Sequence, residues 1–474
     1  MYDNSLFQQL VESGNPTGEV VGVDRFLVKV KGLEGVAADG LVLFESGQSG
    51  MVREVSADTV LLLSLSAENI PLGTLVVLQD NTLTTGVGDG LIGRVVSPLC
   101  QPLDDKGPVQ LTSTWPVFNE APSIMERSLL KDQLPSGVAI VDMLFPIVLG
   151  QRIAVMGDTK SGKSSFLMQM GVSQTNTDRI VVYVLVGKRR VEVDQMIGIL
   201  NDTGAMANSV VVVANVFDSL AQSYLAPYIG CAIAEYFWRN GRDAVIVYDD
   251  LSAHAKIYRE ISLLAQVNPG RDSYPGDMFF AHSSLLERAG KLATTGKTLT
   301  ALPVVVTPGD DITAYLPTSI MSITDGQIIF DLATFRQNIR PAVNTGLSVS
   351  RVGGRAQTSR QKDLSGTLFK KLALYRQASE FAHYGSDLAV ESQESLQLGR
   401  LIHDAFRQAP ADRYTLTEQQ LVLGTIIASA GKRRLDVSLL KTKAREAAAG
   451  VKEESEIDAL ISQLLESVTL GMNT

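Results

Sequence analysis

The residues best suited to chemistry form a short loop at residues 157–164, which read GDTKSGKS and fit the pattern G-x-x-x-x-G-K-[ST]. Glycine lets the backbone curl tightly, so that successive N–H groups can point at phosphate oxygens. In such a loop Lys163 would reach the β- and γ-phosphates, and the Ser164 hydroxyl would bind Mg²⁺. We expect the ligand contacts to come from Gly157, Asp158, Thr159, Lys160, Ser161, Gly162, Lys163, Ser164 and Ser165.

The flanks of this loop have the composition that the pattern requires. Residues 152–156 (RIAVM) form an apolar run suited to a buried strand, and residues 165–170 (SFLMQM) can open a helix. A helix at this point directs the positive end of its dipole at bound phosphate. The alternative is a glycine-rich turn with a coincidental lysine. The order strand, loop, helix favours the phosphate-binding loop of the P-loop nucleotide triphosphatases, with ATP or ADP as ligand.

A second signal follows the apolar run at residues 244–248, where the chain continues with Asp249 and Asp250. A carboxylate at the end of a buried strand is where a Mg²⁺-positioning Asp belongs, so Asp249 would hold Mg²⁺ directly or through water. The alternative is a helix cap, because Asp250-Leu251-Ser252 can open a helix. The two interpretations are compatible, with Asp249 on the metal and Asp250 or Ser252 capping.

Composition restricts the class of protein. The chain has 474 residues, of which 45% are hydrophobic and 20% charged, and a net charge of −9 without a basic block. This argues against nucleic acid as a partner. Two cysteines, Cys100 and Cys231, fit a reducing compartment. We expect neither a membrane span nor a signal peptide.

The four histidines lack metal-ligand spacing, so we expect surface or packing roles for His254, His282, His383 and His403.

The chain divides into three predicted segments. Residues 1–90 contain short β-rich runs broken by turns, typical of a small β-barrel. Residues 91–365 alternate apolar strands with helical stretches such as 222–239, typical of a parallel α/β sheet. In residues 366–474 strand signals vanish and apolar residues recur at helical spacing, which predicts a helical bundle.

Longer motifs resemble a known family. Residues 341–350 (PAVNTGLSVS) resemble a signature shared by alpha and beta subunits of rotary ATP synthases, and the continuation Arg351-Val352-Gly353 resembles the alpha subunit of the F-type enzyme. The same family order is found in residues 248–252, 269–277, 282–288, 322–327 and 384–388. The resemblance runs from about Gly18 to about Ala430.

The resemblance implies an N-terminal β-barrel, a central P-loop domain and a C-terminal helical domain. It implies a hexameric head of alternating alpha-type chains and catalytic beta-type chains around a central rotary stalk, held by a peripheral stalk. Such a complex sits peripherally on the cytoplasmic face of a membrane, or its organelle equivalent. Alpha subunits hold Mg-nucleotide without turning it over and lend an arginine to the neighbouring catalytic site. By resemblance that arginine is Arg351, Ser348 is a further functional position, and Arg340, Pro341 and Gln408 line the adenine side.

Lys188 departs from the family pattern. Catalytic beta subunits carry a Glu at this point, and alpha subunits usually carry Gln. A lysine cannot act as the carboxylate base, so we expect a non-catalytic site in which Lys188 contacts the γ-phosphate.

Further departures are a short segment before the barrel, in which residues 7–11 can make one or two helical turns, and weak resemblance beyond Lys432. The sequence therefore leaves open how the chain would attach to the stator. A divergent or secondary version of the enzyme fits these departures. One alternative is a homohexameric ATPase of the secretion or flagellar export type, which would need a Glu in place of Lys188. Another is a degenerate paralogue that serves assembly, against which the intact Lys163, Asp249 and Arg351 argue.

Overall fold

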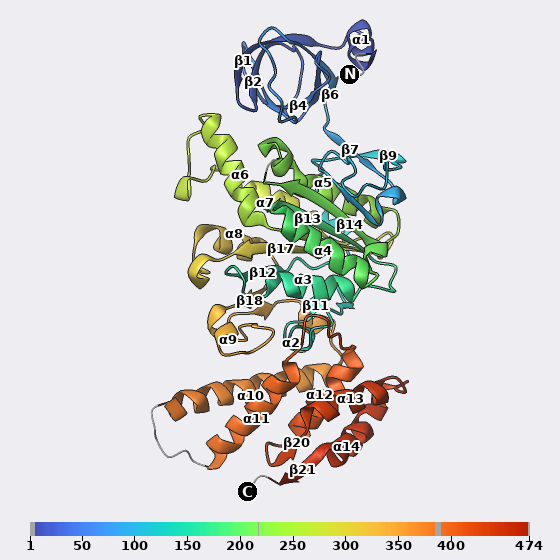
Figure 1. Ribbon diagram of the computed structural model, residues 1–474, viewed down its shortest axis with the longest axis vertical. Coiled ribbons are helices and arrows are strands. Elements are labelled where there is room, and N and C mark those ends of the chain that lie inside the picture. Colours follow the sequence, from blue (N-terminus) through green and yellow to red (C-terminus); the bar gives the residue numbers. More distant parts are fainter. Residues whose placement is uncertain (1–4, 217, 384–389, 473–474) are drawn as a thin grey trace. The chain divides into compact units, whose positions relative to one another are not determined.

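The computed structural model describes residues 5–216, 218–383 and 390–472, which form two compact units (Figure 1). The motif at residues 384–388 lies outside the described residues. The first unit comprises Met1–Ser128, Asn176–Val305 and Thr313–Ile323. The second comprises Leu129–Thr175, Val306–Ile312 and Thr324–Thr474.

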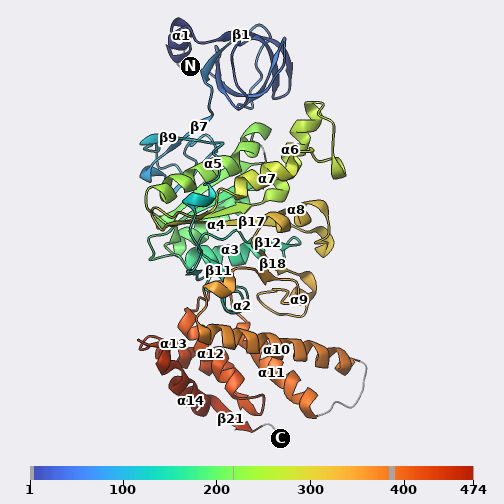
Figure 2. The same ribbon diagram turned by 180° about the vertical axis from the view of Figure 1, so that it is seen from behind.

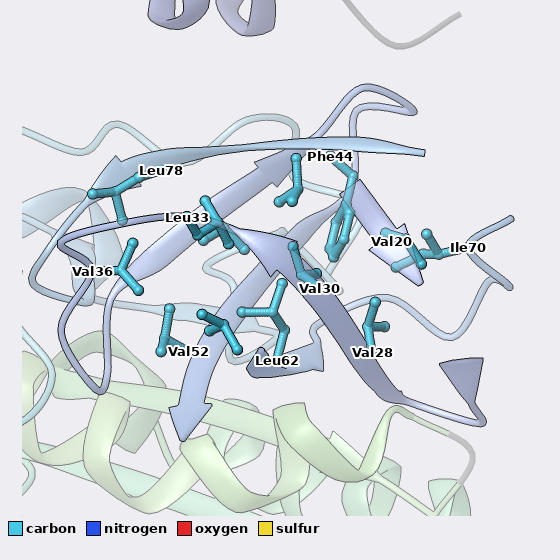
Figure 3. Close-up of a cluster of buried hydrophobic side chains, with 13 residues drawn as sticks. Val20, Val28, Val30, Leu33, Val36, Phe44, Val52, Leu62, Ile70 and Leu78 are labelled. Carbon is cyan, nitrogen blue, oxygen red and sulfur yellow. The ribbon is translucent and has the colours of Figure 1, made fainter. Parts of the chain in front are cut away.

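A closed six-stranded barrel begins the first unit, with strand order β1-β2-β5-β4-β3-β6 (Figures 1 and 2). Its strands are β1 (Thr17–Asp24), β2 (Leu27–Gly32), β3 (Leu41–Phe44), β4 (Ser49–Val55), β5 (Val60–Ser64) and β6 (Leu75–Asp80). Alternate residues such as Val28, Val30, Phe44 and Leu62 pack inside it (Figure 3). The predicted barrel is confirmed.

Helix α1 (Ser5–Glu12) precedes the barrel and has slightly more than two turns, so it is somewhat longer than the one or two turns predicted for residues 7–11. Its Phe7 is buried against Leu43 and Val77, with Leu10 packed beside it. The apolar face of this helix is therefore used on the barrel wall.

The first unit also contains five parallel strands in the order β17-β15-β13-β14-β8. Their bounds are β8 (Arg94–Val96), β13 (Ile180–Lys188), β14 (Ser209–Asn215), β15 (Ala244–Asp249) and β17 (Thr298–Val306). The helices of this unit are α4 (Arg190–Asp202), α5 (Leu220–Arg239), α6 (Leu251–Leu264), α7 (Met278–Leu286) and α8 (Tyr315–Ile323). Short strands β7 (Thr84–Val87), β9 (Ser113–Pro116) and β16 (Gly290–Lys291) complete it.

Burial explains why these runs form central strands. Residues 180–186 of β13 are all buried, and β-branched valines suit a strand covered on both sides. Helix α5 lies directly on β13, where a side chain at Gly230 would collide with Val184. The strand expected at residues 244–248, which is β15, and the helix expected at residues 222–239, which is α5, are confirmed.

The second unit contains the strand before the phosphate loop. β12 (Ala154–Gly157) pairs in parallel with β18 (Gly326–Phe330), and β19 (Val349–Ser350) pairs antiparallel with β18. Around them lie α2 (Ala139–Leu144), α3 (Lys163–Val172), α9 (Leu332–Arg336), β10 (Gln133–Leu134) and β11 (Ile147–Val148).

The end of the chain is helical, as predicted, with one exception. The helices are α10 (Ser359–His383), α11 (Val390–Phe406), α12 (Leu416–Ala428), α13 (Val437–Ala448) and α14 (Ile457–Val468). The expectation that this segment lacks strands was wrong, because β20 (Arg433–Leu435) and β21 (Thr469–Met472) form a small antiparallel sheet. Among the described helices, none is both long enough and apolar enough to cross a membrane.

Candidate nucleotide-binding site

The loop at residues 157–164 connects β12 to α3, the arrangement that the sequence predicts (Figure 1). Gly157 lies so close to the carbonyl oxygen of Phe330 that a side chain would not fit. Gly162 has a φ of 107° and forms the N-cap of α3. Both positions therefore need glycine, for space at the first and for backbone conformation at the second.

Lys163 is buried, and its ammonium points back over the loop. Nζ donates to the carbonyl oxygens of Gly157 at 2.8 Å and Asp158 at 2.7 Å. Asp158 is fixed in turn, because its carboxylate accepts from the backbone N–H groups of Gly309 and Thr159 at 2.8 and 2.6 Å. These hydrogen bonds lower the pKa of Asp158. The positive charge is thus positioned at the start of a helix, where phosphate oxygens bind.

The loop and the first turn of α3 carry one buried hydroxyl group and several exposed ones. The buried Ser161 hydroxyl has no hydrogen-bond partner within the part of the chain that the structure describes. Ser164 and Ser165 are exposed in the first turn of α3, and Thr159 and Lys160 are exposed in the loop. A buried unsatisfied hydroxyl beside a helix N-terminus fits a loop that binds an anion. Ser164 also offers the hard oxygen that Mg²⁺ prefers.

A cavity of about 610 Å³ opens beside the loop, entirely within the second unit. It is lined by aromatic rings of Phe166, Phe330 and Phe335, and by Arg340, Pro341 and Gln408 among others. The Arg340 guanidinium lies 3.5 Å from the ring centre of Phe335. The cavity is large enough for a nucleoside, and its lining combines aromatic and other apolar residues with polar and charged ones.

Gln408 is buried and fixed by its own hydrogen bonds. Its amide oxygen accepts from the backbone N–H of Ala139 at 2.7 Å, and its amide nitrogen donates to the carbonyl oxygen of Gly137 at 2.9 Å. Its backbone N–H donates to the carbonyl oxygen of Arg340 at 3.1 Å. The three predicted residues at positions 340, 341 and 408 are therefore brought together on one cavity wall.

The carboxylates predicted at the strand end lie in the first unit. Asp249 ends β15, and Asp250 caps α6, where its carboxylate accepts from the N–H of Ala253 at 2.6 Å. The capping role predicted for Asp250 is confirmed. The ammonium of Lys188 lies 2.7 Å from Asp249 Oδ1 and 3.9 Å from Asp250 Oδ2. Although burial alone lowers the pKa of Lys188, the charges of the two carboxylates raise it above its usual value.

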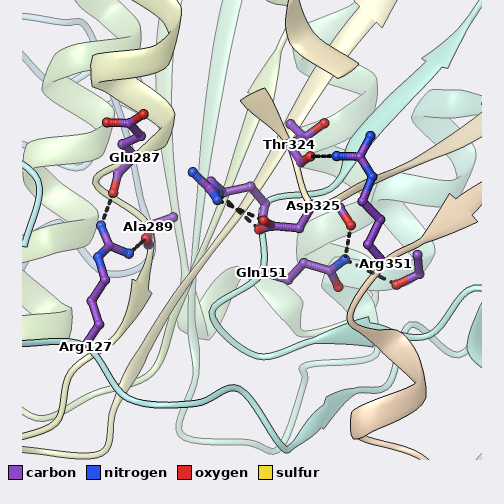
Figure 4. A network of polar contacts seen from close by, with 9 residues as sticks. Arg127, Gln151, Glu287, Ala289, Thr324, Asp325 and Arg351 are labelled. Carbon is purple, nitrogen blue, oxygen red and sulfur yellow. Dashed lines mark hydrogen bonds and ion pairs between the residues drawn. The ribbon is translucent and has the colours of Figure 1, made fainter. Parts of the chain in front are cut away.

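The predicted arginine, Arg351, is exposed and lies directly after β19 (Figure 4). Its guanidinium donates to the carbonyl oxygen of Thr324 at 3.2 Å, and its backbone N–H donates to that of Asp325. Ser348 is buried, and its hydroxyl accepts from the backbone N–H of Ile329 at 2.9 Å. The neighbouring Asp325 is itself held, because its carbonyl oxygen accepts from Gln151 Nε2 at 3.4 Å and its carboxylate pairs with Arg152 at 2.8 Å.

Some residues of the site could not be found by motif reasoning. The three phenylalanines of the cavity come from separate elements and carry no spacing signal. The pairing of Lys188 with Asp249 depends on β13 and β15 being neighbours, which the sequence does not state.

The loop, the strand order and the cavity define a P-loop nucleotide-binding protein. A family model described as the ATP synthase alpha/beta family, nucleotide-binding domain, matches residues 137–350. A second, the ATP synthase alpha/beta chain, C terminal domain, matches residues 357–467 and so continues beyond Lys432, where we expected weak resemblance.

Curated proteins named ATP synthase subunit alpha match most of the chain. The protein from Aquifex aeolicus (strain VF5) is 41% identical over 409 residues, covering 86% of this chain and 81% of that protein. The protein from Clostridium botulinum (strain Eklund 17B / Type B) is 40% identical over 414 residues, covering 87% and 82%. The protein from Helicobacter pylori (strain HPAG1) is 41% identical over 409 residues, covering 86% and 81%. The chain belongs to the ATP synthase alpha/beta family, among the alpha subunits of the F-type rotary enzyme.

Proposed function

We propose that this chain is a nucleotide-holding subunit that does not hydrolyse at its own site and completes the catalytic site of a neighbour. The single observation that supports this most is the ion pair of Lys188 with Asp249, at a position where the family resemblance implies a glutamate in catalytic subunits. An ammonium held beside two carboxylates stays charged near neutral pH and cannot accept a proton from water.

The loop from Gly157 to Ser165 would bind the phosphates of ATP or ADP, with Lys163 supplying the charge. The cavity with Arg340, Pro341 and Gln408 would take the adenine base. Ser164 and Asp249 are the proposed Mg²⁺ ligands, and both offer oxygen atoms of the kind that Mg²⁺ prefers. Bound Mg²⁺ would neutralise phosphate charge.

Arg351 would act in trans on the phosphoryl group at a beta-type neighbour, where a guanidinium can meet developing charge. This role implies beta-type chains as partners, in an alternating hexamer of three alpha-type and three beta-type chains. It also implies a central rotary stalk and a peripheral stalk. The complex would couple ATP synthesis or hydrolysis to ion movement and lie peripherally on the cytoplasmic face of a membrane. The domain limits 1–90, 91–365 and 366–474 and the roles of the individual site residues are part of this proposal.

Calorimetric titration of the isolated chain with Mg-ADP tests nucleotide binding. Lys163→Ala should abolish measurable binding, because it removes the positive charge that faces the phosphates. Lys452→Ala removes an exposed lysine from the C-terminal segment and serves as the matched control, which should bind like the wild type. Equal affinity in wild type and Lys163→Ala would refute the assignment of the loop.

A further inference from the structure

Helix α2 carries a buried acidic residue, Asp142, which is 1% exposed and lies outside the phosphate loop. Its carboxylate accepts from the backbone N–H and the hydroxyl of Ser136 at 2.8 and 2.7 Å, from the backbone N–H of Gly137 at 3.0 Å, and from Gln419 Nε2 at 2.9 Å. Burial raises the pKa of Asp142 to about 6, although these hydrogen bonds oppose the rise. Near neutral pH the carboxylate is therefore ionised and can only accept hydrogen bonds.

The carboxylate holds a tight turn at residues 136–139, directly before α2. Gly137 has a φ of 74°, which places the backbone in the left-handed region that glycine tolerates. The backbone N–H of Val138 donates to Ser136 Oγ at 3.2 Å, and that of Asp142 donates to the carbonyl oxygen of Val138 at 2.9 Å. The turn therefore keeps the carbonyl group of Gly137 and the N–H group of Ala139 in fixed positions.

These two backbone groups hold one wall of the cavity beside the phosphate loop. Gln408 accepts from the N–H of Ala139 at 2.7 Å and donates to the carbonyl oxygen of Gly137 at 2.9 Å. The backbone N–H of Tyr414 donates to the same carbonyl oxygen at 3.3 Å. The cavity-lining residues between these contacts are Ala409, Pro410 and Asp412. Both ends of segment 408–414 are therefore fastened to the turn that Asp142 holds.

Helix α12 reaches the same carboxylate through Gln419. The side-chain nitrogen of Gln419 donates to Asp142 Oδ2 and to the carbonyl oxygen of Tyr414, at 2.9 Å each. An amide has two N–H groups, so both hydrogen bonds can be made at once. Asp142 is therefore connected to segment 408–414 by two routes, the turn and Gln419.

We propose that Asp142 is a positioning residue for nucleotide binding, which holds the nucleobase wall at residues 408–412 in place through the turn at residues 136–139. This inference rests on the proposed function, because it requires that the base enters this cavity. The phosphate loop is held by other contacts, among them those of Lys163 with the carbonyl oxygens of Gly157 and Asp158. Loss of the Asp142 carboxylate should therefore weaken binding of the base and leave binding of the phosphates intact.

The test compares two ligands, Mg-ADP and magnesium pyrophosphate, by calorimetric titration of the full chain. Asparagine has the shape of aspartate, but its N–H groups would face donors at position 142, so the turn would have to move. We expect Asp142→Asn to weaken ADP binding about 10-fold or more, as loss of a supporting hydrogen-bond partner does in metal sites. Pyrophosphate affinity should change less than about twofold.

Gln419→Met is the second variant and carries the test if Asp142→Asn does not fold. It keeps the side-chain length and removes the amide, so ADP binding should weaken about threefold, the effect of one net hydrogen bond, again without loss of pyrophosphate. In a Gln408→Met background, Asp142→Asn should change the ratio of the two affinities less than about twofold, because Gln408 is the residue that the turn holds.

Asp363→Asn is the matched control, because it makes the same chemical change at an exposed position of α10, and it should bind both ligands like the wild type. An unchanged ratio of the two affinities in Asp142→Asn and Gln419→Met would overturn this inference alone. So would an equal loss of both ligands, which would make Asp142 a general structural residue. A wild-type chain that binds neither ligand would overturn the proposed function as well.

Discussion

Lys188 is the residue on which the proposed non-catalytic role of this chain depends. Hydrolysis needs a base that takes a proton from water near neutral pH, and an ammonium with an unperturbed pKa of about 10.4 does not do so. Pairing with Asp249 and Asp250 moves its pKa further upward, although burial opposes this. Lys188 therefore contributes positive charge at this position and does not act as a general base.

We predict that the purified wild-type chain releases no phosphate from ATP above background in a coupled phosphate assay. Lys188→Glu alone should not create an efficient ATPase. It would place a third carboxylate beside Asp249 and Asp250, and like charges at this distance favour protonation or displacement of one of them. Sustained phosphate release by the wild type that Lys163→Ala removes would instead favour the homohexamer hypothesis.

At the level of single residues, sequence reasoning located the loop and the Asp250 cap because both depend on local order along the chain. The Lys188–Asp249 pair and the aromatic cavity wall depend on which strands become neighbours. Leu185 faces Asp249 only because β13 pairs with β15. Such long-range pairing has no spacing signal in one sequence.

At the scale of elements, helices α5, α6 and α7 meet around two buried histidines. His254 Nε2 lies 3.0 Å from the carbonyl oxygen of Tyr224, so it must donate there. In neutral His254, Nδ1 is then an acceptor, and His282 Nε2 donates to it at 3.2 Å. Tyr224 and Tyr228 pack against the His254 ring. The packing role predicted for these two histidines is confirmed.

This pair should make stability depend on pH. Burial lowers the pKa of His254 to about 4, and burial and the neighbouring His254 lower that of His282. The unfolded chain takes up these protons at about pH 6.5, so the stabilisation is complete above that pH and is lost as the pH falls toward 4. The loss expected for His254 alone is about 3 kcal/mol in the free energy of unfolding.

Urea denaturation at about pH 7 and about pH 4.5 measures this loss. The double variant His254→Gln/His282→Gln cannot titrate in this range, so its free energy of unfolding should change less between the two pH values than that of the wild type. An equal change in both proteins would show that the histidine pair does not control the pH dependence.

Long elements with a consistent hydrophobic pattern, such as β13 and α5, could be predicted from the sequence. The strands β20 and β21 were not, because three or four residues give too few alternating positions to distinguish a strand from a loop. Their pairing also joins residues 433–435 to 469–472, so neither strand is stable without its distant partner.

At the scale of the whole molecule, family membership makes this chain one component of a larger machine. Ile124 and Met125 are each 88% exposed, and large apolar side chains at adjacent exposed positions suit a surface that a subunit covers. The central claim is that the chain completes a partner's catalytic site through Arg351, which is exposed at the end of β19.

The most direct test is steady-state phosphate release by the complex reconstituted with beta-type chains and Arg351→Ala. We predict a loss of at least about 10²-fold, below the 10³–10⁵ range of arginine fingers elsewhere, with nucleotide binding to the partner retained. Arg355→Ala, which removes another exposed arginine nearby, should leave turnover near the wild-type value. Near-normal turnover with Arg351→Ala would contradict the account and leave Arg351 a structural residue that bonds Thr324.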